Sequence, residues 1–157
     1  MINVLFVCTG NICRSPTAEG VFRHLLLQEG LADKITADSA GTHNYHIGEA
    51  PDPRSIATAQ ARGISLDGQY SRLLQESDFC TFDLILAMDR DHLEHLNGRA
   101  PSDRRQRVKL FLDYNPSIEI RDVPDPYYGG QHGFELVLDL LEEGSRGLLA
   151  CIRRDYL

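Results

Sequence analysis

The chain has 157 residues, with 16 lysines and arginines against 23 aspartates and glutamates, which gives a formal net charge of -7. The length suits one domain with a core covered on two faces, so we expect residues 1–157 to form a single domain. Hydrophobic residues at 42% and charged residues at 25% exclude a disordered or collagen-like chain. The acidic balance argues against a nucleic-acid-binding protein, and the short apolar runs argue against a membrane protein.

The first residues show no targeting signal. They lack the basic segment and the cleavage site of a signal peptide, so we expect a cytoplasmic protein whose thiols stay reduced. The chain has four cysteines, at Cys8, Cys13, Cys80 and Cys151. We expect Cys80 and Cys151 to be buried packing residues, because free cysteine is among the most buried residue types.

The first third of the chain predicts two strands and two helices. Residues 4–7 form a continuous apolar run, typical of a strand buried on both faces. A helix follows, with Ser15 as its N-cap, Pro16 in its first turn and Gly30 at its end. A weaker strand near a sheet edge is predicted at residues 35–40. A second helix opens at Asp52 and closes at Gly63, a typical left-handed C-terminal glycine.

The rest of the chain continues the alternation of strands and helices. Residues 65–77 are polar and irregular. Residues 82–87 predict a buried strand, residues 89–96 a short helix that ends at Gly98, and residues 108–112 a fourth strand. A proline- and glycine-rich loop is expected over residues 114–133, followed by a last helix from Phe134 that Gly144 and Gly147 weaken. A loop this long in a compact domain is often functional.

The order of elements predicts an α/β fold. Strands that alternate with helices form right-handed crossovers, which place helices on both faces of a mostly parallel sheet. The expected architecture is a three-layer, Rossmann-like arrangement with four strands. Ligands of such sheets bind beyond the carboxyl ends of the strands.

The segment from Cys8 to Ser15 combines a thiol with an anion site. It links the first strand to the first helix, whose free N–H groups and partial positive charge attract anions. Arg14 adds a planar cation that matches phosphate geometry, and Ser15 can donate a hydrogen bond to the sulfur. Helix N-termini and nearby cations favour a reactive cysteine thiolate. The spacing therefore predicts that Cys8 attacks phosphorus while Arg14 and the loop hold the oxygens.

Two simpler interpretations of this segment fit less well. A buried, inert cysteine would not explain an arginine and a serine at this spacing between a strand and a helix. A nucleotide-binding loop needs several glycines and a lysine, and Gly10 is the only glycine between Cys8 and Ser15.

Residues 4–16 (VLFVCTGNICRSP) closely resemble the signature loop of the low-molecular-weight protein tyrosine phosphatases. The resemblance continues, in the family's order, at residues 38–41 (DSAG), 51–54 (PDPR), 82–89 (FD to MD) and 125–129 (DPYYG). It implies a four-stranded parallel sheet in one domain and hydrolysis of protein phosphotyrosine through a phosphocysteine on Cys8. It also implies that neither a metal nor a cofactor takes part.

A phenolate leaving group needs a proton, and the long loop offers Asp122 and Asp125 as acids. The resemblance assigns the role to Asp125, and Pro126 restricts that residue to extended geometry. The same carboxylate then acts as the base for hydrolysis of the phosphocysteine. The other interpretation is that Asp125 and Pro126 only start a turn.

The remaining candidates line or support the loop. We expect the loop residues to bind the phosphate and aromatic or apolar side chains to flank the substrate: Thr9, Gly10, Asn11, Ile12, Cys13, Ser15, Tyr45, Tyr127 and Tyr128. Asn11 suits a left-handed turn. By resemblance Ser39 is its partner, and Gln69 stands where the family usually has a histidine. The resemblance also implies a reversible disulfide between Cys8 and Cys13, which would make the enzyme redox-sensitive.

Other functions and sites stay open at this point. An arsenate reductase or a protein arginine phosphatase would have a similar loop, although arginine phosphatases carry threonine where Ile12 stands. A non-catalytic module that binds phosphoproteins is a third alternative. His92 and His95 lie three residues apart, but without a third ligand we expect them to be solvated rather than metal-binding. Asp89 is expected as a charged helix start, and the chain as a monomer.

Overall fold

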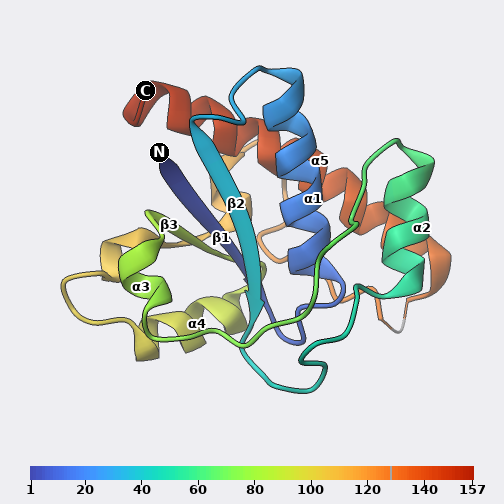
Figure 1. Cartoon of the computed structure of the whole chain (residues 1–157), viewed down its shortest axis with the longest axis horizontal. Coiled ribbons are helices and arrows are strands. Elements are labelled where there is room, and N and C mark those ends of the chain that lie inside the picture. The colour runs from blue at the N-terminus through green and yellow to red at the C-terminus, as the bar shows by residue number, and fades with distance from the viewer. Residues whose placement is uncertain (128) are drawn as a thin grey trace.

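The computed structural model describes residues 1–127 and 129–157, and its centre is a four-stranded sheet with the order β2-β1-β3-β4 (Figure 1). The strands are β1 (Ile2–Cys8), β2 (Ile35–Gly41), β3 (Leu84–Ala87) and β4 (Val108–Leu110). All neighbouring strands are parallel. The predicted parallel sheet is therefore confirmed, and the weaker second strand lies at an edge.

Helices cover both faces of this sheet. They are α1 (Arg14–Gln28), α2 (Pro53–Ala61), α3 (Asp78–Thr81), α4 (Arg90–Arg99) and α5 (Gly130–Asp155), with single 3-10 turns at η1 (Arg105–Arg107) and η2 (Phe111–Tyr114). Figure 1 shows α1, α2 and α5 on one side of the strands and α3 and α4 on the other. The predicted three-layer α/β architecture is confirmed. In the part of the chain that the structure describes, no helix has the length and apolarity needed to cross a membrane.

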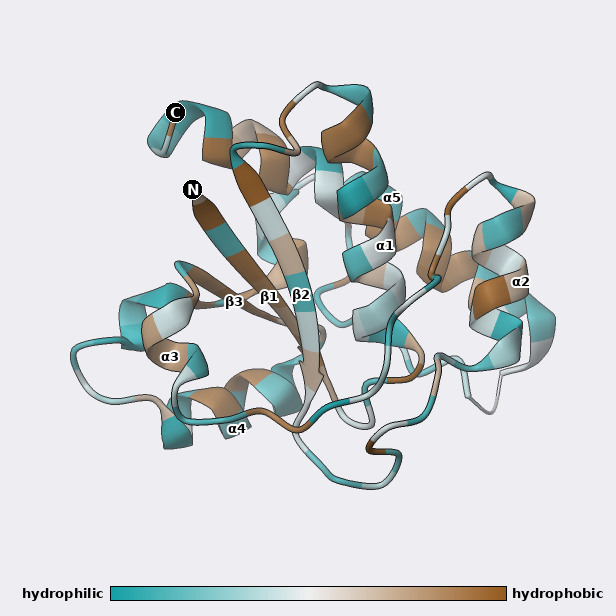
Figure 2. Cartoon of the chain, viewed as in Figure 1, coloured by the Kyte–Doolittle hydropathy of each residue, from teal (hydrophilic) through white to brown (hydrophobic). Residues whose placement is uncertain are grey.

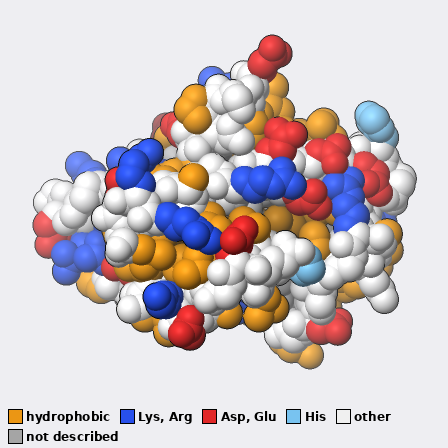
Figure 3. Space-filling model, turned by 90° about the horizontal axis from the view of Figure 1, so that it is seen from above, with side chains coloured by type: hydrophobic (Ala, Val, Ile, Leu, Met, Phe, Trp, Pro, Cys, Tyr) orange, Lys and Arg blue, Asp and Glu red, His pale blue; other side chains and the backbone are white. Residues whose placement is uncertain are grey.

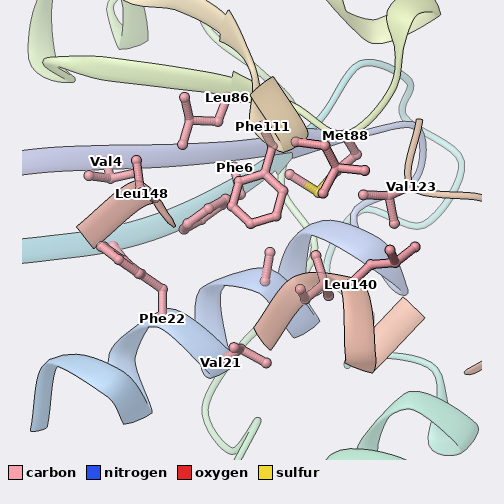
Figure 4. Packing of buried hydrophobic residues seen from close by; sticks show 14 of the residues in the cluster. Val4, Phe6, Val21, Phe22, Leu86, Met88, Phe111, Val123, Leu140 and Leu148 are labelled. Atoms are coloured by element: carbon pink, nitrogen blue, oxygen red, sulfur yellow. The ribbon is translucent and has the colours of Figure 1, made fainter. Parts of the chain in front are cut away.

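The two faces of β1 belong to two hydrophobic clusters. Val4 and Phe6 point into the cluster with α1 and α5, whereas Leu5 and Val7 point into the cluster with α3 and α4. The ring of Phe6 lies 5.8 Å from that of Phe22 and 5.7 Å from that of Phe111, both in edge-to-face arrangement (Figure 4). Each such pair stabilises the fold by about 0.5–1.5 kcal/mol in addition to the contribution of the apolar area that it buries. Figure 2 shows β3 as mostly apolar, as expected for a strand covered on both faces.

The start of α1 differs from the prediction by one residue. The helix begins at Arg14 and its N-cap position is Cys13, so Ser15 is not the cap. The Ser15 hydroxyl instead lies within hydrogen-bond distance of Cys8 and Asn11. The predicted N-cap was wrong because this serine side chain turns back toward the loop.

Three predicted boundaries near the C-terminus are corrected. The strand at residues 108–112 ends at Leu110, because the chain turns into η2. Helix α4 continues through Gly98 to Arg99, and α5 begins at Gly130 rather than Phe134. The short helix α3 was not predicted.

The glycines of α5 allow a close contact. A Cβ at Gly144 would lie 2.5 Å from the ring of Phe111, and one at Gly147 would overlap the Tyr114 carbonyl oxygen. The two glycines therefore let η2 approach the helix, and α5 stays continuous through them.

Candidate active site

The segment between β1 and α1 lies at the carboxyl end of a central strand. Since β1 pairs with β2 on one side and β3 on the other, this end of the sheet is the place where parallel α/β folds bind ligands. The loop bends at Asn11, whose φ of 57° lies in the left-handed region. Asparagine tolerates this region better than most residues, as the sequence predicted.

A pocket of about 320 Å³ opens over the loop. It is lined by most of the side chains that the sequence nominated, and by one histidine that it did not: Cys8, Thr9, Gly10, Ile12, Cys13, Arg14, Tyr45, His46, Asp125 and Tyr127. Residues from three separate parts of the chain thus meet at one site. Tyr128, another nominated wall residue, lies outside the described residues.

Cys8 lies at the floor of this pocket and is 3% exposed. Its Sγ lies 3.0 Å from Ser15 Oγ, and Asn11 Nδ2 donates to the same oxygen at 2.7 Å. Because that oxygen accepts from Asn11, the Ser15 hydroxyl can donate its proton to the sulfur at 3.0 Å, with the Ala40 carbonyl oxygen as a more distant acceptor at 3.4 Å. A hydrogen-bond donor, the N-terminus of α1 and Arg14 therefore surround the thiol, which is the environment of a nucleophilic cysteine.

The guanidinium of Arg14 is 5% exposed and is held from one side. Its Nη1 donates to Asp89 Oδ2 at 2.8 Å and to the Val123 carbonyl at 3.0 Å. Both Nη1 protons are therefore used, which orients the opposite edge, Nε and Nη2, toward the pocket. That edge has the two parallel N–H groups that fit a phosphate.

The structure separates the two candidate acids. Asp122 accepts hydrogen bonds from the side chain of Arg90 at 2.8 Å and from its backbone N–H at 2.9 Å, and these bonds lower the pKa of Asp122. Asp122 is not among the side chains that line the pocket over Cys8. Asp125 lines that pocket, and its Oδ2 lies 4.0 Å from Arg14 Nη2. Its Oδ1 accepts from the Tyr127 N–H at 3.0 Å, which fixes the carboxylate.

A buried hydrogen-bond chain supports the loop from below. Asn11 Nδ2 donates to Ser39 Oγ at 2.9 Å, and Ser39 donates to Glu19 Oε1 at 2.8 Å. Burial raises the pKa of Glu19 to about 7, although Arg23 at 3.0 Å opposes the shift. The structure thus brings Asn11 and Ser39 together, as the family resemblance implied.

Gln69 contacts the helix rather than the loop. Its Nε2 donates to the Pro16 carbonyl at 2.9 Å, in the first turn of α1. The loop is held by the next residues: Ser71 Oγ donates to the Gly10 carbonyl at 2.9 Å, and the Arg72 N–H donates to Asn11 Oδ1 at 3.0 Å. Their proximity to Gln69 in the chain was the only sequence signal for them.

The other three cysteines have different environments. Cys13 is buried beside the pocket, and burial together with the nearby Asp52 carboxylate raises its pKa to about 12. Cys80 is exposed and Cys151 is half-buried. The prediction of buried packing was wrong for Cys80, because Phe79 is the residue of the one-turn helix α3 that enters the core.

His92 is the main correction in the site. It was expected to be solvated, but it is 4% exposed and its Nε2 lies 2.8 Å from Thr9 Oγ1. Asp89, expected only as a helix start, caps α4 and also binds Arg14. The sequence signal was their position directly after β3, which ends beside β1. Among residues 1–127 and 129–157 no cluster of three histidine, cysteine or acidic side chains could hold a metal ion.

The predicted wall residues surround the mouth of the pocket. Tyr45 is exposed and stacks on His43 with ring centroids 5.2 Å apart. The Arg54 guanidinium lies over the Tyr127 ring at 5.2 Å. Ile12 adds an apolar side chain from the loop itself. The mouth can therefore hold a flat group between aromatic and apolar surfaces.

The fold and the pocket define a class of α/β protein in which a thiol, a helix N-terminus and an arginine form an oxyanion site. A family model described as low molecular weight phosphotyrosine protein phosphatase matches residues 3–156, and the chain belongs to this family.

Relatives and solved structures agree with this assignment. The chain is 48% identical over 153 residues to a low molecular weight protein-tyrosine-phosphatase of Streptomyces coelicolor, covering 96% of this chain and 93% of the relative. It is 44% identical over 157 residues to a putative one of Synechocystis, covering 99% of both. A protein tyrosine phosphatase of Entamoeba histolytica with Hepes in its active site is 40% identical, with a TM-score of 0.96 over the whole of both chains.

Proposed function

We propose that this protein hydrolyses phosphotyrosine in proteins, with Cys8 as nucleophile, Arg14 as phosphate ligand and Asp125 as general acid and base. The observation that carries the proposal is the position of the Cys8 sulfur, 3.0 Å from the Ser15 hydroxyl in a pocket that Arg14 and Asp125 also line. The names of the relatives support the same activity.

The first step transfers the phosphoryl group to sulfur. The Cys8 thiolate attacks phosphorus and forms the S–P bond, while the bond between phosphorus and the tyrosine oxygen breaks. Asp125 gives its proton to the departing phenolate, which leaves as tyrosine. The loop N–H groups and the Nε–Nη2 edge of Arg14 hold the three remaining oxygens, where the charge of the transition state is concentrated.

The second step hydrolyses the phosphocysteine. The Asp125 carboxylate takes a proton from water, and the water oxygen attacks phosphorus. The S–P bond breaks and inorganic phosphate leaves. Cys8 returns as a thiolate, which the Ser15 hydroxyl and the helix N-terminus stabilise. Neither step needs a metal or a cofactor, since the charges are balanced by Arg14 and by backbone N–H groups.

The substrate preference rests on the mouth of the pocket. Tyr45, Tyr127 and Ile12 offer aromatic and apolar surface to a phosphotyrosine ring. A structure titled as an arginine phosphatase has a TM-score of 0.87 at 30% identity, so the fold alone does not select the leaving group. Phosphoarginine is therefore included as a competing substrate in the test.

The proposal includes the setting of the enzyme. We propose that residues 1–157 act as one domain, as a monomer in the cytoplasm, where a catalytic thiol stays reduced. Protein substrates rather than nucleic acids fit the net charge of -7. Figure 3 shows the end of the molecule opposite the pocket, at the amino ends of the strands, where basic and acidic side chains are interspersed.

One assay separates the alternatives. Wild-type protein and Cys8→Ser are given a phosphotyrosine peptide, a phosphoarginine peptide and arsenate with a thiol reductant, all in the presence of a metal chelator. We expect Cys8-dependent phosphate release from phosphotyrosine, at least tenfold faster than from phosphoarginine. Faster release from phosphoarginine would indicate the arginine phosphatase, and arsenite formation the reductase. Binding of the phosphopeptide without release would indicate a non-catalytic module.

A further inference from the structure

His92 lies in the first turn of α4 and connects two parts of the phosphate site. Its ring is buried, and its two nitrogens meet different elements. Nε2 lies 2.8 Å from Thr9 Oγ1, in the loop directly after Cys8. Nδ1 lies 3.0 Å from Asp89 Oδ1, at the end of the segment that follows β3. The ring therefore bridges the ends of two neighbouring strands.

The carboxylate of Asp89 lies between His92 and Arg14 and contacts both. Its Oδ1 accepts the His92 backbone N–H at 2.9 Å, and the His92 ring lies against the same oxygen. Its Oδ2 accepts from Arg14 Nη1 at 2.8 Å. Asp89 Oδ1 thus caps α4 and contacts the His92 ring, and Oδ2 binds the guanidinium of Arg14. The orientation of the guanidinium depends on where this carboxylate is held.

The His92 ring is uncharged where it lies between the Thr9 hydroxyl and the Asp89 carboxylate. Burial and the Arg14 charge lower its pKa to about 4, against the smaller opposite effect of Asp89 and Asp125. The neutral ring makes one hydrogen bond, between Nε2 and the Thr9 hydroxyl, which can either donate or accept according to the tautomer. Nδ1 lies 3.0 Å from Asp89 Oδ1 and packs against that carboxylate without a hydrogen bond to it.

We propose that His92 is a positioning residue for oxyanion binding: its ring holds the Thr9 end of the loop by a hydrogen bond and packs against the Asp89 carboxylate that orients the Arg14 guanidinium. The inference rests on the proposed function, since it assumes that the loop and Arg14 bind the phosphate. His92 itself does not line the pocket and does not touch the reacting atoms. It acts by reducing the freedom of the two groups that do, which is how a supporting shell improves a site.

Binding of inorganic phosphate tests the proposal without relying on turnover. His92→Leu removes the ring's hydrogen bond to Thr9, and we expect the Kd for phosphate, measured by calorimetry, to rise roughly tenfold, as for the loss of one hydrogen bond. His92→Gln carries an amide at about the distance of Nε2, can bond Thr9 again, and is expected to recover phosphate binding to within about threefold of wild type. KM for an aryl phosphate should rise in parallel with this Kd.

Two further variants separate positioning from stability. Thr9→Val removes the hydroxyl and leaves α4 intact, so it should weaken phosphate binding, and adding it to His92→Leu should cost little more. His95→Gln is the matched control one turn along α4, because His95 packs near His43, and it should bind phosphate as wild type does.

The outcomes discriminate between the possibilities. A His92→Leu protein with wild-type phosphate affinity would overturn the proposal, whether or not its melting temperature falls. If that variant does not fold, the Kd of Thr9→Val for phosphate is the deciding measurement, and a wild-type value would overturn the proposal. Wild-type protein that binds phosphate without cleaving phosphotyrosine would overturn only the proposed function. Wild-type protein that binds no phosphate would overturn both.

Discussion

The sulfur of Cys8 and the hydroxyl oxygen of Ser15 lie 3.0 Å apart, and Asn11 donates to the same hydroxyl from the other side. The serine hydroxyl can therefore donate to the sulfur, which lies nearer than its other acceptor, the Ala40 carbonyl oxygen at 3.4 Å. A hydrogen bond to a charged group is worth about 1.5–3 kcal/mol. The serine therefore stabilises the thiolate both before attack and as the leaving group of the second step.

Ser15→Ala is expected to lower kcat by roughly 10–100-fold, in line with the loss of one charge-assisted hydrogen bond. The rate of alkylation of Cys8 by iodoacetate at pH 7 should also fall in the variant, because the thiolate has lost a hydrogen-bond donor. Ser145→Ala is the control, because this serine is also fully buried but lies in α5, away from the pocket. An alkylation rate equal to that of the wild type would contradict the role of Ser15.

Asp125→Ala is expected to slow release of tyrosine from phosphotyrosine by two or more orders of magnitude, because the phenolate then leaves without a proton. For aryl phosphates whose phenols are acidic, the rate of the first step should fall much less, because these phenolates can leave without a proton. Asp122→Ala serves as the matched control and should keep near wild-type rates, since Arg90 binds that carboxylate outside the pocket. Equal losses for good and poor leaving groups would show that Asp125 is not the acid.

Cys13 gives a test of the redox behaviour that the family resemblance implies. Hydrogen peroxide oxidises the Cys8 thiolate to a sulfenic acid, and attack by the Cys13 sulfur then forms a disulfide and releases water. Burial raises the pKa of Cys13 to about 12, so Cys13 stays protonated while Cys8 reacts with the oxidant. Peroxide inactivation should be reversed by dithiothreitol in wild type and in Cys80→Ser, and only partly in Cys13→Ser. Full recovery of Cys13→Ser would reject the disulfide.

Glu19 predicts a dependence of stability on pH. Its pKa is raised from 4.5 to about 7 by burial, so the folded protein binds a proton here that the unfolded chain loses. This contribution to stability is complete below pH 4.5 and is lost as the pH rises to about 7, with a maximum of about 3 kcal/mol. Glu19→Gln stays neutral and keeps the acceptor for Ser39. Its free energy of unfolding relative to wild type should therefore increase between pH 4.5 and 7.5.

Denaturant unfolding at several pH values measures this difference. Glu76→Gln, at an exposed position, is the control and should follow wild type at every pH. Parallel profiles for Glu19→Gln and wild type would mean that the buried carboxyl does not titrate in this range.

The sequence predicted the features that local patterns encode. The run from Cys8 to Ser15 and the pair of Asp125 with Pro126 were recognisable because a few adjacent residues define the chemistry. The role of His92 was not, because Thr9 lies 83 positions away in the chain and the contact arises from the pairing of β1 with β3. The same holds for Asp89, whose position at a helix start gave no indication of its second partner, Arg14.

Errors of orientation have a similar origin. Cys80 belongs to a helix of one turn, which is too short for a periodic pattern to show which side faces the core. Gly144 was interpreted as a weakness in a helix, whereas the ring of Phe111 occupies the place of its absent side chain. In both cases the outcome depends on a residue that is distant in the sequence but close in the fold, and local helix propensity carries no information about such contacts.

The central claim is that phosphate passes through the sulfur of Cys8, and rapid acid quenching after mixing with a phosphotyrosine peptide tests it directly. With labelled phosphate and a metal chelator present, we expect close to one phosphate per chain in the pre-steady state, located by peptide mapping on Cys8 and absent from Cys8→Ser. Turnover of phosphotyrosine by Cys8→Ser, or label on another residue of the wild type, would contradict the account.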